Sequence, residues 1–317
     1  MLEGLEAIKG VGDATASKLR SAGFTTIEAV AVTPLREIMF KTGLGYENVL
    51  KITQEARKLA HIDFTTAKEL WERRKGMLRC STGAQKLNEL VGGGIETQAM
   101  TEMIGEYGVG KTQLCLMLSV TAQLPKSQKG FEGNVIYMDT EGTFSPERVY
   151  NIASAVGLDP EQTLNNIILC RVYNSDHQCL IIDHLFKKCP EENVKLVIVD
   201  SMVSHFRGEY LGRESLAERQ QLLNQNLHKL LRLAEAYNLA VVITNQVLAN
   251  PVQVYGGNPN RPVGGHIMAH ACTHRIYITR GKKGTRKARV IDSPYLPESE
   301  ASFLITAKGI EDAPDAD

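Results

Sequence analysis

The chain has 317 residues, enough for one large α/β domain and a smaller one at roughly 100–200 residues per domain. Hydrophobic residues make up 43% and charged residues 23%, which excludes a disordered chain and a fibrous repeat. The 36 basic and 36 acidic residues give a formal net charge of zero. This balance argues against nucleic-acid binding through a uniformly basic surface and leaves local basic strips open.

No sequence feature indicates export or membrane insertion. The chain has no apolar run near the length of about 18 residues that a membrane span needs, and its N-terminus lacks the regions of a secretory signal. The six cysteines form no CxxC pair and several lie in apolar stretches. We therefore expect buried free thiols and a cytoplasmic protein.

Three regions follow one another along the chain. Residues 1–60 contain short helical patterns separated by glycines, residues 61–80 form a linker, and residues 81–317 alternate apolar runs with amphipathic helices. In the third region we expect strands at 100–104, 135–138, 167–172, 194–199, 240–244 and 275–279, and helices at 111–123, 146–156, 176–188 and 216–237. This alternation predicts an α/β fold with a mostly parallel sheet covered on both faces.

The N-terminal region contains a glycine turn, with Gly10 and Gly12, between short helical patterns at 8–19. A weaker copy follows at 42–46. The pattern resembles a helix-hairpin-helix, whose turn presents backbone N–H groups to a DNA phosphate without reading the base sequence. A plain helical turn is the alternative.

Residues 105–112 read GEYGVGKT and match the phosphate-binding pattern GxxxxGK(S/T) at every fixed position. They follow an expected strand and precede an expected helix, which is the context that this loop requires. Its backbone N–H groups and the helix N-terminus bind an anion. We expect Lys111 to contact the β- and γ-phosphates of ATP and Thr112 to bind Mg²⁺. The residues expected to bind the nucleotide are Gly105, Glu106, Tyr107, Gly108, Val109, Gly110, Lys111, Thr112 and Gln113.

Three further expected strands end in polar residues. Asp200 follows one of them, and in P-loop enzymes such a carboxylate holds Mg²⁺. Asp139 and Glu141 follow another; either could deprotonate the attacking water, or could simply cap the next helix. Gln246 follows a third and suits a γ-phosphate sensor, although the residues alone favour an ordinary strand-end turn.

The short sequence motifs around these sites resemble those of the RecA-type recombinase core, and in particular those of the RadA-type strand-exchange recombinases. They are GGGIE at 92–96, DTEGTF at 139–144, TNQV at 244–247, GGH at 264–266 and DSPYLPE at 292–298. The resemblance covers nearly the whole chain. Several long motifs that occur in the family's order are specific evidence for the family. It implies an all-α helix-hairpin-helix domain and a RecA-like ATPase core. It also implies ATP-dependent helical filaments on single-stranded DNA that pair and exchange homologous strands.

The resemblance assigns roles to residues that match by position. It makes Glu141 the catalytic base and Gln246 the γ-phosphate sensor, with Lys111 completing the catalytic set. It places Arg148 against the adenine, although Ser145 stands nearby where the family usually has a basic residue. The resulting role of Ser145 stays open.

A second group of residues matches segments at the subunit boundary. Asp292, Ser293 and Pro297 match the segment that caps ATP from the neighbouring subunit. Whether K⁺ lies beside the γ-phosphate near Asp292 stays open. His266 matches a residue that links the nucleotide to a DNA-binding loop. The spacing of His266, His270 and His274 is also that of metal ligands on a helix, which no other ligand pattern supports.

Two segments, 207–214 and 248–265, have the composition of loops, and the second has no periodicity. Long structureless stretches inside a core are usually functional. The resemblance makes them DNA-binding loops, with phosphate contacts from Arg207, Arg213 and Arg219 and with Val252 between bases. Without it, the arginines are explained by solvated charge. Residues 280–289, with six basic residues, have the pattern of a hairpin tip that either contacts DNA or is solvated.

Phe64 and Ala67 lie three residues apart in the linker, a spacing that alone is typical of core packing. The resemblance implies instead that they insert into the next subunit and add a strand to its sheet, which builds a filament. Its implied partners are single- and double-stranded DNA, further copies of the chain and recombination mediators, at the nucleoid. A hexameric RecA-fold helicase and a mediator paralogue without strand exchange are the alternatives.

Overall fold

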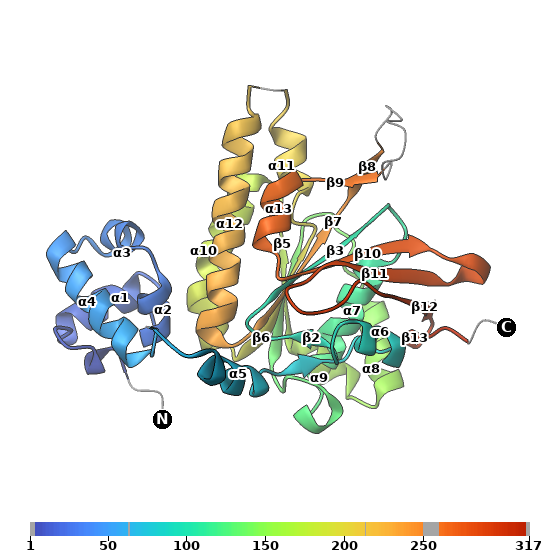
Figure 1. Ribbon diagram of the computed structural model, residues 1–317, viewed down its shortest axis with the longest axis horizontal. Helices are drawn as coiled ribbons and strands as arrows, with labels where there is room; N and C mark the ends of the chain where they lie inside the picture. Colours follow the sequence, from blue (N-terminus) through green and yellow to red (C-terminus); the bar gives the residue numbers. More distant parts are fainter. Residues whose placement is uncertain (1–3, 63, 213, 250–259, 315–317) are drawn as a thin grey trace.

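A computed structural model describes residues 4–62, 64–212, 214–249 and 260–314, apart from the side chains of 248–249 and 260–262. Figure 1 shows a small helical domain, a linker with one helix, and a large α/β core whose sheet lies between two layers of helices. Within the described ranges, no helix is both long and apolar enough to cross a membrane.

The N-terminal domain has a hydrophobic core of its own. Buried apolar residues from Leu5 to Ala56, among them Phe24, pack against one another at helical spacing. An ion pair of 3.1 Å between Glu37 and Arg232 joins this domain to the core domain. The elements are a 3₁₀ helix (Leu5–Ala7), α1 (Asp13–Ser21), α2 (Ile27–Val32), α3 (Leu35–Thr42) and α4 (Tyr46–Leu59).

The described part of the core domain contains one sheet of nine strands. Six strands pair in parallel in the order β10-β3-β7-β6-β4-β5, which leaves β5 at an edge. Antiparallel strands extend the other side in the order β13-β12-β11. The strands are β3 (Met100–Gly105), β4 (Asn134–Asp139), β5 (Ile167–Arg171), β6 (Val194–Asp200), β7 (Ala240–Asn245), β10 (His274–Arg280), β11 (Arg286–Asp292), β12 (Glu300–Thr306) and β13 (Gly309–Asp312).

Helices cover both faces of this sheet, because its central strands are apolar on both sides. On β6, Leu196 and Ile198 join one buried cluster, and Val197 and Val199 join the other. The first cluster includes residues of α6 (Gln85–Leu90), α7 (Lys111–Thr121), α8 (Pro146–Val156) and α9 (Pro160–Asn165). The second includes residues of α10 (Ser175–Glu191), α11 (Ser204–Glu209), α12 (Leu216–Tyr237) and α13 (Gly265–Ala271).

The predicted fold is confirmed, since all six expected strands and all four expected helices occur with ends shifted by only a few residues. All six cysteines lie in described parts of the chain and are free thiols. The linker contains a helix that the sequence reading did not predict, α5 (Ala67–Lys75). It begins with a capping box between Thr66 and Glu69.

Three predicted loops were partly wrong. The segment 207–214 begins in a helix, because α11 continues to Glu209. In the segment 248–265, the short strands β8 (Val247–Ala249) and β9 (Asn260–Pro262) pair with each other, and α13 begins at Gly265. The predicted tip 280–289 is shorter, because β10 continues to Arg280 and β11 begins at Arg286. Alternating burial along β11 explains this, since every second side chain packs on the core despite the charges between them.

Candidate nucleotide and DNA sites

The phosphate-binding loop joins the end of β3 to the start of α7. Gly105 is required because a Cβ there would lie 2.4 Å from the carbonyl oxygen of Ile278 on β10. Gly110 has a φ of 105°, which favours glycine. Lys111 Nζ donates to the carbonyl oxygens of Gly105 and Glu106, each at 2.8 Å. The sequence pattern thus produces the strand, loop and helix that an anion site needs.

A cavity of about 480 Å³ lies at this loop and at the carboxyl ends of β4, β6 and β7. Ligands of open α/β sheets bind at this edge of the strands. Most of the residues predicted for the nucleotide or its hydrolysis line the cavity together. The wall consists of Tyr107, Gly108, Gly110, Lys111, Thr112, Gln113, Glu141, Thr143, Asp200, Ser201, Thr244, Gln246, Arg286 and Ile305.

Asp200 is buried and accepts hydrogen bonds from three hydroxyl groups. Thr112 and Tyr137 donate to its Oδ2, both at 2.8 Å, and Thr244 donates to its Oδ1 at 2.5 Å. A hydroxyl and a carboxylate in direct contact beside a phosphate loop are the oxygen donors that Mg²⁺ prefers. The residues present therefore fit this ion.

Burial changes the acidity of two groups at the site. Burial lowers the pKa of Lys111, and the carboxylates of Asp200 and Glu141 partly oppose this change. Burial also raises the pKa of Tyr137 well above its usual value, and the neighbouring Asp200 raises it further. Tyr137 therefore remains a protonated hydrogen-bond donor to Asp200.

The two candidate bases have different surroundings. The Asp139 carboxylate accepts backbone N–H groups of residues 141–144 at 2.7–3.2 Å and an ion pair from Arg171 at 3.4 Å. Glu141 is exposed in the cavity, and its Oε1 accepts hydrogen bonds from Gln246 at 3.0 Å and from Ser201 at 3.2 Å. Asp139 therefore builds the turn, and Glu141 is the carboxylate that can reach a ligand.

Arg148 reaches the cavity only through Gln113, whose side-chain oxygen accepts its Nε at 2.8 Å. Its guanidinium also donates to the carbonyl oxygens of Thr306 and Ala307 in the turn after β12. Ser145, which differs from the family pattern, is the N-cap of α8 and accepts the backbone N–H of Arg148 at 3.2 Å. This capping contact is a structural reason for a serine at position 145.

Sequence reasoning missed several residues of the cavity. Arg286, assigned to the hairpin tip, donates from Nε to the carbonyl oxygen of Val109 at 3.0 Å and lines the wall. Ile305 lies against Gly110, where a Cβ would meet it at 2.4 Å. Both come from the antiparallel extension: β11 pairs with β10 beside the loop, and β12 pairs in turn with β11, so only this strand pairing brings the two residues to the loop. The sequence signal that could have identified Thr244 as a cavity residue is its position near a strand end, two residues before Gln246.

The segment with Asp292, Ser293 and Pro297 lies away from the cavity. In the sheet register Asp292 pairs with Arg275, which pairs with Glu102, whereas the P-loop begins after Gly105. Three residues of strand place Asp292 about 10 Å farther down the sheet. The next residues contact His274 and Glu96 rather than the P-loop, through Ser293 and Tyr295.

The predicted DNA-contacting residues lie mostly on the surface. Figure 1 shows α11, the start of α12 and the β8–β9 ladder at the same end of the core. Arg207 on α11 is exposed and Arg219 on α12 is half-exposed, whereas Arg213 and Val252 lie outside the described residues. Gly10 and Gly12 are exposed in the turn before α1, and Gly10 has a φ of 95°.

The three histidines do not form one cluster. His266 and His270 stack on α13 with ring centroids 6.3 Å apart, whereas His274 lies on β10 and contacts Glu96 and Ser293. Across the described residues, no group of three or more histidine, cysteine or acidic side chains could hold a metal ion.

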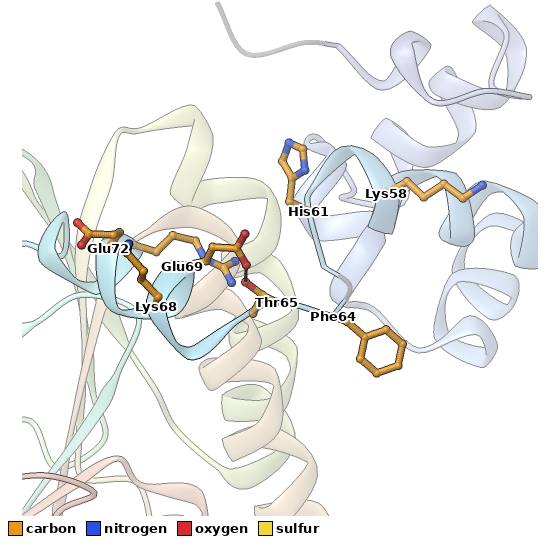
Figure 2. A pocket seen from close by; sticks show the side chains of 8 residues that line it. Lys58, His61, Phe64, Thr65, Lys68, Glu69 and Glu72 are labelled. Carbon is orange, nitrogen blue, oxygen red and sulfur yellow. Dashed lines mark hydrogen bonds between the residues drawn. The ribbon is translucent and has the colours of Figure 1, made fainter.

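The linker presents Phe64 to solvent. Its side chain is fully exposed, and in Figure 2 the ring points outward, away from His61 and Glu69. Ala67 follows as the first residue of α5. A separate cavity of about 480 Å³ lies between the edge strand β5 and α10. Its wall consists of Ile136, Ile168, Cys170, Ile181, His184, Leu185, Lys187, Lys188 and Glu191.

Both parts of the chain match families of known proteins. Residues 73–313 match the family model described as Rad51, and residues 2–58 match the model described as a SAM-like helix-hairpin-helix tandem. The chain is 49% identical over 305 residues to the DNA repair and recombination protein RadA of Aeropyrum pernix, covering 96% of this chain and 95% of that protein. The resemblance read from the sequence words is thereby confirmed. The chain belongs to the Rad51 family.

Proposed function

We propose that the chain is an ATP-dependent recombinase that assembles on single-stranded DNA and exchanges homologous strands. The observation that carries the proposal is the joint presence of a complete P-loop site, an exposed Phe64 and a capping segment (residues 292–297) that lies away from its own P-loop. The 49% identity to a protein named for DNA repair and recombination supports it. A helix-hairpin-helix match at residues 2–58 supports a role on DNA.

The cavity residues divide the work on ATP. The P-loop N–H groups and Lys111 bind the phosphates, and Thr112 with Asp200 holds Mg²⁺, which neutralises phosphate charge when it is bound. Glu141 accepts the proton of the attacking water, and the Ser201 hydroxyl holds the Glu141 carboxylate in place. Gln246, hydrogen-bonded to Glu141, responds to the γ-phosphate. Arg148 positions Gln113 beside the nucleotide.

The capping segment acts on another subunit. Asp292 lies about 10 Å from its own P-loop along the sheet, and the following residues lead farther away. Ser293 and Pro297 therefore approach only the nucleotide of a neighbouring copy. ATP bound between subunits then stabilises the assembly, so that it is a conformational ligand as well as a substrate. If K⁺ lies beside the γ-phosphate near Asp292, ATP hydrolysis should be faster in K⁺ than in Na⁺, and a comparison of the two rates tests this.

Phe64 makes the contact that joins one subunit to the next. It docks in the apolar cavity beside β5 of the next subunit, and the unpaired edge of β5 accepts the extended linker as an added strand. Ala67 leaves room at the contact because its side chain is small. The donor and acceptor surfaces differ, so the contact is head to tail and generates a helix rather than a closed pair.

DNA lies at the end of the core that carries α11 and the start of α12 (Figure 1). Arg207 and Arg219, with Arg213, neutralise phosphates, and Val252 separates bases. His266, at the start of α13, connects this surface to Gln246 through the intervening strands. The glycine turn at Gly10 and Gly12 binds duplex DNA, and recombination mediators load the filament at the nucleoid.

A strand-exchange assay tests the function. Circular single-stranded and homologous linear duplex DNA are incubated with the full chain and Mg²⁺, with and without ATP, beside Lys111→Ala. We expect joint molecules only with ATP and the unchanged chain. Stimulation of another recombinase without joint molecules would instead identify a mediator, and unwinding by closed hexamers a helicase.

A further inference from the structure

A buried carboxylate outside the nucleotide cavity joins distant parts of the chain. Glu96, on the short strand β2 (Ile95–Glu96), is 2% exposed. Its Oε1 faces His274 Nε2 at 2.9 Å and Arg74 at 3.3 Å. Its Oε2 accepts the Tyr295 hydroxyl at 2.8 Å and faces Arg79 at 3.4 Å. These partners come from the linker helix α5, from β1 (Arg79–Cys80), from β10 and from the segment after β11.

A second layer of contacts fixes the turn of the capping segment. Ser293 Oγ lies 3.0 Å from His274 Nδ1 and accepts the backbone N–H of Leu296 at 3.0 Å. The Tyr295 ring meets the His274 ring edge-on at 5.4 Å, and the Arg74 guanidinium lies 5.2 Å from its centroid. The linker helix and the capping segment are therefore in direct contact, with Glu96 beneath them.

The glycines before Glu96 make this approach possible. A Cβ at Gly92 would lie 3.1 Å from Leu296 of the capping segment, and one at Gly94 would lie 2.3 Å from the carbonyl oxygen of Cys80. Both residues also have positive φ angles, 73° and 137°. The GGGIE motif at 92–96 thus forms a bend that leaves room for the capping segment and directs the Glu96 side chain toward it.

The Glu96 carboxylate is held in its charged form. Burial is the largest single influence and raises its pKa, but the hydrogen bonds from His274 and Tyr295 and the nearby positive charges together lower it by more, so the net pKa is lowered. Arg74 and His274 add favourable charge. A buried anion with several donors fixes the positions of those donors strongly, because a donor that moves leaves charge unpaired.

We propose that Glu96 is a positioning residue that couples the linker helix to the capping segment. The orientation in which Phe64 docks on a neighbouring subunit and the orientation in which Asp292 caps a nucleotide are then adopted together. This inference rests on the proposed function, because it takes both segments as subunit contacts. It goes beyond it by naming the group that makes them one unit.

The test compares four variants of the full chain on single-stranded DNA: Glu96→Gln, Tyr295→Phe, Arg74→Gln and, as a matched control on the exposed side of α5, Arg73→Gln. Assembly by light scattering and ATP hydrolysis are measured against ATP concentration. Loss of the charged acceptor in Glu96→Gln raises the half-saturating ATP about tenfold. Tyr295→Phe and Arg74→Gln raise it about threefold, and turnover at saturating ATP stays within about twofold of the unchanged chain.

The outcomes separate this inference from the function on which it rests. If the unchanged chain fails to assemble with ATP, the proposed function is wrong. If it assembles and the variants keep its half-saturating ATP, or lose turnover alone, the coupling is wrong. Tyr295→Phe keeps the ring between Arg74 and His274, so misfolding does not explain its effect. Glu96→Gln combined with Tyr295→Phe should match Glu96→Gln alone, and additive effects would contradict a shared network.

Discussion

Phe64→Ala tests the filament joint with little risk to the fold. The ring is fully exposed in the single chain, so its removal uncovers little buried surface in the folded subunit. Upon docking beside β5, the ring becomes buried in an apolar cavity of about 480 Å³. Full burial of such a side chain contributes about 1.5–3 kcal/mol. At about 1.4 kcal/mol per factor of ten, each joint of Phe64→Ala is about 10- to 150-fold weaker.

Sedimentation velocity over a range of protein concentrations, with ATP and Mg²⁺, measures the concentration at which long assemblies appear. We expect this concentration to rise about 10- to 150-fold for Phe64→Ala, with an unchanged melting curve for the monomer. Phe40→Ala is the matched control, because Phe40 on α3 is also a strongly exposed phenylalanine, at 90%. Equal assembly of the two variants would refute the joint.

The acceptor side gives an independent check. Ile168 is half-buried on β5 in the wall of the cavity, so Ile168→Glu places a carboxylate where the ring docks. Ile168→Glu retains Phe64, and Phe64→Ala retains the cavity. A mixture of the two should therefore stop at one-to-one dimers, since a head-to-tail contact has only one intact joint in that pair. A mixture that stays monomeric would show that the ring docks elsewhere.

Three further predictions concern the core domain. Glu141→Gln should lower ATP turnover about 100- to 10,000-fold and keep binding of a fluorescent nucleotide; equal loss of binding would contradict its role as base. Tyr137→Phe should lower the free energy of unfolding by about 1.5–3 kcal/mol in urea, and an unchanged midpoint would contradict the bond to Asp200. The lowered pKa of Glu96 contributes stability above the usual value of 4.5 that is lost as pH falls through the folded value. Melting temperatures of the chain and of Glu96→Gln should therefore converge below pH 4.5, and a constant difference would contradict this.

Local patterns were sufficient to predict the strands and the phosphate loop. Apolar runs of strand length recur between amphipathic helices, and the loop needs glycines at fixed positions whatever surrounds it. The choice between Asp139 and Glu141 was beyond such patterns, because both carboxylates follow the same strand. The contacts of the next turn favour Glu141: the chain folds back so that four N–H groups donate to Asp139, and Glu141 is left in the cavity.

Contacts between distant segments could not be predicted in the same way. Arg286 reaches Val109 only because β11 pairs with β10 beside the phosphate loop. In sequence it is one of six basic residues in ten, and nothing separates it from its neighbours. The Glu96 network likewise depends on residues up to 199 positions apart. Register and crossover decide such contacts, and neither follows from local periodicity.

The position of charge, rather than its sum, decides which surface suits DNA. In the basic run 280–289, Lys287 and Arg289 form ion pairs with Glu300 and Glu298 on the β12 side, and Arg286 faces the phosphate loop. This run is therefore partly neutralised within the chain. Arg207 and Arg219 form no ion pair with any part of the chain that the structure describes. The zero net charge thus includes arginines that form no ion pair with a described residue, at the end of the core that carries α11 and the start of α12.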